Sequence, residues 1–84
     1  MKLIIKGFVQ GVGFRWFVAS AARGLGLKGF VRNLPGGSVE VRAKGPEGGL
    51  NELIKAIYDG PGRVTGMETE WGIEVEDSNF YIRF

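Results

Sequence analysis

Two stretches of this 84-residue chain carry an apolar stripe at helical spacing, and each lies between segments in which apolar and polar side chains alternate. The stronger stripe falls at positions i, i+3, i+4, i+7 and i+8, namely Leu50, Leu53, Ile54, Ile57 and Tyr58. A helix with one apolar stripe can cover a sheet only with that side, because its opposite side meets water. The pattern therefore predicts two helices on the same face of one sheet.

The other stripe, at Phe14, Phe17, Ala21 and Leu25, predicts a helix near residues 14–24 with both phenylalanines in the core. The order of the segments is β-α-β-β-α-β-β, which predicts an α/β (α+β) sandwich of the ferredoxin-like βαββαβ type with a mostly antiparallel sheet. The alternating segments predict strands at about residues 2–9, at 28–33, at 39–44, through Met67, Thr69, Trp71 and Ile73, and through Phe80, Ile82 and Phe84.

The charged residues of the strands are expected to point away from the helices. In the third strand Glu40, Arg42 and Lys44 alternate with apolar residues and are predicted to face outward. Lys28 and Arg32 are interpreted in the same way, as solvated strand charges.

The composition excludes several kinds of chemistry. The chain has no histidine and no cysteine, so it has no Ser-His or Cys-His pair, no imidazole metal ligand and no disulfide. Its carboxylates are scattered and form no evident Ca²⁺ or Mg²⁺ site. We therefore expect neither a metal nor a cofactor, and any catalysis would depend on positioning and electrostatics.

Length and charge limit the organisation and the partners. Eighty-four residues predict one domain, residues 1–84, and a net charge of +2 is weak evidence for nucleic-acid binding. Met1 leads directly into a strand pattern, and no apolar run approaches membrane-spanning length. We therefore expect a cytoplasmic monomer that binds neither nucleic acid nor membrane.

Residues 7–15 read Gly-Phe-Val-Gln-Gly-Val-Gly-Phe-Arg and connect the first strand to the first helix. Glycines let backbone N–H groups approach an anion, a helix N-terminus adds free donors, and the planar guanidinium of Arg15 suits phosphate oxygens. The run is equally consistent with a tight turn that carries a surface arginine. Dinucleotide and Walker loops are excluded, because Trp16 occupies the position of the third glycine and no Gly-Lys-Ser or Gly-Lys-Thr occurs.

The same nine residues resemble the signature of the acylphosphatase family, G-x-V-Q-G-V-G-F-R. The second signature of that family follows downstream, where residues 29–33 read Gly-Phe-Val-Arg-Asn and are followed by Gly37, Val39 and Gly45 at the expected spacing. One departure is Gly36, where relatives often carry aspartate. The resemblance covers nearly the whole chain and implies the ferredoxin-like fold that the element order also predicts.

The resemblance implies hydrolysis of small acyl phosphates to a carboxylate and inorganic phosphate. Arg15 would bind the phosphoryl group, the backbone N–H groups of Gln10, Gly11, Val12, Gly13, Phe14 and Arg15 would surround it, and Asn33 would orient the attacking water. Inorganic phosphate or sulfate should bind at the same place. From its residue type alone Asn33 is also a common hairpin residue, and Arg15 could pair with a carboxylate.

Two other functions are kept as alternatives. An RNA-binding module shares the βαββαβ order, but its aromatic RNP1 pattern is broken here by Val31 and Arg32 and lies on the wrong strand. A non-catalytic acylphosphatase-like domain, as in hydrogenase-maturation proteins, would keep the fold without the activity.

Overall fold

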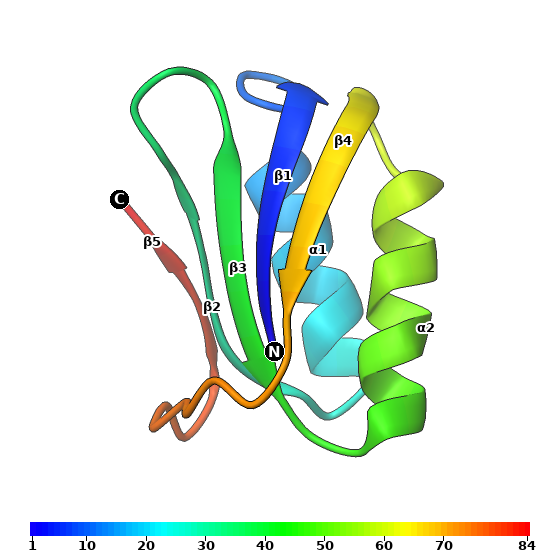
Figure 1. The fold of residues 1–84 in the computed structure, drawn as a ribbon, viewed down its shortest axis with the longest axis vertical. Coiled ribbons are helices and arrows are strands. Elements are labelled where there is room, and N and C mark those ends of the chain that lie inside the picture. Colours follow the sequence, from blue (N-terminus) through cyan, green and yellow to red (C-terminus); the bar gives the residue numbers. More distant parts are fainter.

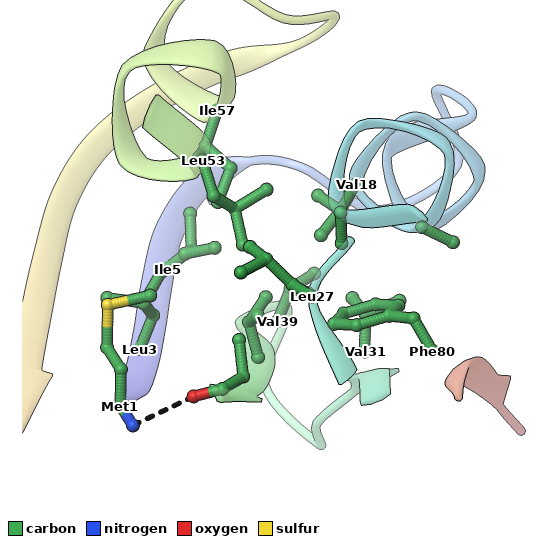
Figure 2. Close-up of a cluster of buried hydrophobic side chains, with 14 of the residues drawn as sticks. Met1, Leu3, Ile5, Val18, Leu27, Val31, Val39, Leu53, Ile57 and Phe80 are labelled. Carbon is green, nitrogen blue, oxygen red and sulfur yellow. Dashed lines mark hydrogen bonds between the residues drawn. The ribbon is translucent and has the colours of Figure 1, made fainter. Parts of the chain in front are cut away.

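The protein, described here from a computed structural model of residues 1–84, is a five-stranded sheet with two helices packed on one face (Figures 1 and 2). The sheet order is β4-β1-β3-β2-β5, and every neighbouring pair is antiparallel except β2 and β5. This confirms the ferredoxin-like prediction. The elements are β1 (Lys2–Phe8), α1 (Phe14–Gly24), β2 (Lys28–Asn33), β3 (Val39–Lys44), α2 (Glu47–Tyr58), β4 (Arg63–Glu70) and β5 (Phe80–Arg83).

The hydrophobic core lies between the sheet and the helices. Figure 2 shows side chains of both helices and of the strands meeting in one cluster, among them Leu3, Val31, Val18 and Leu53. Each of these side chains is completely buried, and burial of such a side chain contributes roughly 1.5–3 kcal/mol. The core therefore fixes the orientation of the helices relative to the strand ends that carry the site.

The first helix buries a slightly different stripe from the one predicted. Phe14 is buried as expected, but Val18 and Ala22 form the centre of the buried face. Phe17 and Ala21 are only partly buried and pack at the border of the core. The shift arises because α1 also contacts α2, so its apolar face divides between the sheet and its neighbouring helix.

The predicted extent of the fourth strand was wrong. The strand was expected to run through Trp71 and Ile73, whereas β4 ends at Glu70. Glu70 pairs with Lys2, the first residue of β1, so no neighbouring strand remains beyond it. Gly72 has a φ of 79°, and from there the chain crosses to the opposite edge of the sheet, where β5 pairs with β2 (Figure 1).

The outer face of the sheet is less open than the charge pattern predicted. Glu40 does point away from the helices, but it is only 2% exposed because Arg32 and Arg42 cover it and donate hydrogen bonds to its two carboxylate oxygens. Arg32 and Lys28 are both exposed, as expected of solvated strand charges, although Arg32 also pairs with Glu40. The Arg83 guanidinium lies 3.9 Å from the ring centroid of Phe30, so the charged side chains on the outer face of the sheet continue from β3 and β2 to β5.

No helix of the structure has the length and apolar character that a membrane crossing requires.

Candidate active site

Three chain segments that are distant in sequence meet at one end of the sheet. β1 and β2 are both antiparallel to β3, and β5 is parallel to β2. The C-terminal ends of β1, β2 and β5 therefore lie at the same end of the sheet. The loop 9–13 follows β1, Asn33 is the last residue of β2, and Phe84 follows β5. The topology therefore brings the two predicted catalytic residues to one place.

Two glycines shape the loop between β1 and α1. Gly11 and Gly13 have φ values of 77° and 76°. Residues with a Cβ adopt this left-handed backbone conformation only at a cost in conformational free energy. Gly13 also occupies the N-cap position of α1, where no side chain caps the helix and no acidic residue lies in the first turn. The helix N-terminus is thus left without any negative partner.

The backbone N–H groups of this loop are free to bind a ligand. No backbone hydrogen bond outside the helices and strands has an N–H of residues 9–13 as its donor. The first three N–H groups of α1, from Phe14 to Trp16, have no acceptor one turn earlier in the helix. A run of unpaired donors at a helix N-terminus is suited to bind an anion.

Arg15 lies in the first turn of α1 and pairs with no carboxylate, since none of the salt bridges of the chain includes it. Its Nη1 donates a hydrogen bond of 3.3 Å to the carbonyl oxygen of Arg83, and its guanidinium lies 4.7 Å from the ring centroid of Phe84. These two contacts orient the side chain but leave its charge uncompensated. The alternative in which Arg15 pairs with a carboxylate is therefore contradicted.

Asn33 makes no hydrogen bond through its side chain, and its Oδ1 is the one buried side-chain oxygen or nitrogen of the chain without a partner. The hairpin that follows is closed by the backbone instead, with Leu34 N–H donating to the Ser38 carbonyl oxygen. The Asn33 side chain thus makes no hydrogen bond that closes the turn. An unpaired buried oxygen is unfavourable unless it has a ligand or a water to accept from.

Gln10, which the sequence assigned only to the loop, links the two halves of the site. Its Nε2 donates hydrogen bonds of 2.9 and 2.8 Å to the carbonyl oxygens of Leu34 and Ser38. Leu34 directly follows Asn33, so this amide holds the glycine loop next to the end of β2. No sequence pattern could have predicted this contact, because its partners are backbone atoms more than twenty positions away.

A cavity of about 150 Å³ opens between these segments. Arg15 and Asn33 line it together with Gly11 and Gly13 of the glycine loop. Gln10 and Val12 do not line it, and Phe14 forms part of its buried wall. The complete lining is Val9, Gly11, Gly13, Phe14, Arg15, Trp16, Asn33, Ile82 and Phe84.

Sequence reasoning missed the apolar half of this lining. Trp16 directly follows Arg15 and could have been found by that adjacency. Ile82 and Phe84 could not, since only the pairing of β5 beside β2 brings them to the cavity.

The cavity offers donors and one positive charge but no acid, base or cluster of metal ligands. Three or more carboxylates gather nowhere in the structure. Such an arrangement can stabilise negative charge on a phosphoryl group and can hold a water, whereas proton transfer to a poor leaving group would need an acid that is not there.

The fold and the site together define a ferredoxin-like α/β sandwich with an anion-suited loop between β1 and α1. The family model described as Acylphosphatase matches residues 1–82, and the chain belongs to the acylphosphatase family. The acylphosphatase of Caldivirga maquilingensis is 49% identical over 88 residues, which cover all of this chain and 93% of that protein.

Solved structures agree with this assignment. The acylphosphatase from Bacillus subtilis superimposes with a TM-score of 0.92 and 37% identity, over 99% of this chain and 96% of that one. HypF from T. kodakarensis matches with a TM-score of 0.84 and 29% identity, over 99% of this chain but only 12% of its own. The same fold thus occurs both in acylphosphatases of this size and as a small part of a much longer protein.

Proposed function

We propose that the protein hydrolyses the carboxyl–phosphate bond of small acyl phosphates, that Arg15 and the N–H groups of residues 10–15 hold the phosphoryl group, and that Asn33 orients the attacking water. The observation that carries this proposal is that Asn33, whose buried Oδ1 has no hydrogen-bond partner, lines the same cavity as Arg15 and the glycine loop. Membership of the acylphosphatase family supports the reaction class.

The loop and Arg15 supply the stabilisation that phosphoryl transfer needs. The transition state is loose, and its negative charge spreads over the three equatorial phosphoryl oxygens. Fixed N–H donors and a guanidinium stabilise this charge without having to reorganise. Because Arg15 has no carboxylate partner, its full charge acts on the bound group.

Asn33 supplies orientation rather than proton transfer. Its Oδ1 accepts a hydrogen bond from water and directs a lone pair of that water toward phosphorus. The water oxygen bonds to phosphorus while the bond from phosphorus to the carboxyl oxygen breaks, and the carboxylate leaves with the electron pair. The proton of the water passes to a phosphoryl oxygen, so the site needs neither an acid nor a base.

The two alternative functions have less support. On the outer sheet face Phe30 is only 7% exposed and lies near three arginine side chains, so its ring offers little surface for stacking with a base. A non-catalytic acylphosphatase-like domain would not require Asn33, with its unpaired Oδ1, to line the same cavity as Arg15. We also propose that the protein acts as a cytoplasmic monomer without a metal.

Release of inorganic phosphate from benzoyl phosphate in the presence of EDTA tests the function. We expect hydrolysis at an undiminished rate, because no step uses a metal. We expect p-nitrophenyl phosphate to be a poor substrate, since its phenolate is a poorer leaving group than a carboxylate and the site offers no acid to protonate it. Loss of activity in EDTA with recovery in Mg²⁺ would contradict the mechanism.

A further inference from the structure

The cavity has an apolar side that the phosphoryl chemistry leaves unused. Its polar groups are the glycine loop, Arg15 and Asn33, whereas Trp16, Ile82 and Phe84 contribute apolar surface. Phosphoryl oxygens gain nothing from contact with such surface, because it offers them no hydrogen bond. In an acyl phosphate, the part that this apolar side could contact is therefore the acyl group.

Trp16 is the most conspicuous part of this side. It lies in the first turn of α1 directly after Arg15, and 69% of it is exposed. Phe14, two positions earlier, is 1% exposed and belongs to the core. The fold does not use the indole ring, although an exposed tryptophan leaves a large apolar surface in water.

The Phe84 ring adds to this apolar surface next to Arg15. Its ring lies under the Arg15 guanidinium at 4.7 Å and also lines the cavity. A phosphoryl group held by Arg15 and the loop amides leaves its acyl group to extend toward the outer part of the cavity. The side chains there are aromatic or aliphatic.

We propose that Trp16, together with Ile82 and Phe84, contacts the acyl group of the substrate, and that the site prefers acyl phosphates with an aromatic acyl group to those with a short aliphatic one. This inference rests on the proposed acyl phosphate hydrolysis, and it leaves the proposed binding and reaction of the phosphoryl group unchanged. Offset or edge-to-face contact between an indole and a phenyl ring favours the aromatic acyl group by about tenfold.

Binding of two non-hydrolysable analogues tests the preference separately from catalysis. Benzoylphosphonate and acetylphosphonate share the reacting end and differ in the acyl group, and calorimetry gives their dissociation constants. The variants are Trp16→Ala and, as a matched control, Trp71→Ala. Trp71 is 52% exposed, follows β4 and does not line the cavity.

We expect the unmodified protein to bind benzoylphosphonate about tenfold more tightly than acetylphosphonate. Trp16→Ala should reduce this ratio to near one, and Trp71→Ala should keep it. An unchanged ratio in Trp16→Ala, no preference in the unmodified protein, or no binding of either analogue would overturn the inference. Failure to hydrolyse benzoyl phosphate would instead contradict the proposed function, while the ratio of the two dissociation constants would still decide the role of Trp16.

Discussion

Arg15 is a cation at the end of a helix where cations are least stable. The partial positive charge of a helix N-terminus disfavours a nearby guanidinium by about 0.3–1 kcal/mol at an exposed site, and no carboxylate offsets this repulsion. A phosphoryl group between Arg15 and the loop amides would convert both repelling charges into attraction. The residue thus lowers the stability of the free protein slightly in favour of binding.

The shape of the Arg15 side chain should matter as well as its charge. Arg15→Lys keeps the charge but loses the planar fork and its contacts with the Arg83 carbonyl and the Phe84 ring. We expect phosphate to inhibit about tenfold more weakly and kcat to fall about 10²-fold, on the scale of one lost preorganised contact. Inhibition constants and steady-state rates measure both effects. A lysine variant with unchanged values would show that charge alone suffices.

At the scale of elements, β2 and β3 combine structural and functional roles. Their outer face holds Glu40 beneath two arginines, and the end of β2 presents Asn33 to the cavity. Burial alone would raise the pKa of Glu40, but hydrogen bonds from Arg32 and Arg42 and the charges of both arginines outweigh it and hold the pKa below its usual value. Glu40 is therefore ionised in the folded protein and fixes the two strands together.

Replacement of Glu40 should destabilise the sheet in a pH-dependent way. Glu40→Gln leaves Arg32 and Arg42 side by side without a counter-charge, and we expect a loss of about 2 kcal/mol at pH 7. Because folding lowers the pKa of Glu40, its contribution is complete above the ordinary value of 4.5 and is lost as the pH falls through the lower, folded value.

Urea unfolding at pH 7 and at pH 3 measures this difference. The difference in the free energy of unfolding between the unmodified protein and Glu40→Gln should be larger at pH 7 than at pH 3. Glu68→Gln is the control, since Glu68 forms an exposed salt bridge with Lys6 and should change stability little. If this difference in the free energy of unfolding were larger at pH 3 than at pH 7, its pH dependence would have the opposite sign and the role of Glu40 would be refuted.

At the scale of the whole molecule, the sequence predicted the order of the elements and the helix-covered sheet, and it placed Arg15 and Asn33, the proposed catalytic residues, in two motifs that meet at one cavity. It could do so because alternation and helical spacing are local signals, and because the two glycine-containing motifs name Arg15 and Asn33 directly. It could not predict the end of β4 at Glu70, which depends on where β1 begins. The link from Gln10 to Leu34 and the contribution of β5 to the cavity likewise depend on how distant segments meet.

The carboxyl ends of three strands converge on one cavity, so in the proposed mechanism phosphate binding and water positioning come from different segments of the chain. The loop after β1 and the start of α1 would supply the phosphate donors, whereas Asn33 comes from β2. The two tasks should therefore be separable by substitution, and this separation is the central claim of the mechanism.

The steady-state kinetics of Asn33→Ala on benzoyl phosphate, together with its inhibition by inorganic phosphate, test this claim most directly. The substitution removes the unpaired Oδ1 and leaves the loop and Arg15 in place. We expect kcat to fall at least about 10²-fold, while the inhibition constant of phosphate stays close to that of the unmodified protein. A folded Asn33→Ala variant with a nearly normal kcat would contradict the claim and would leave Asn33 as a hairpin residue only.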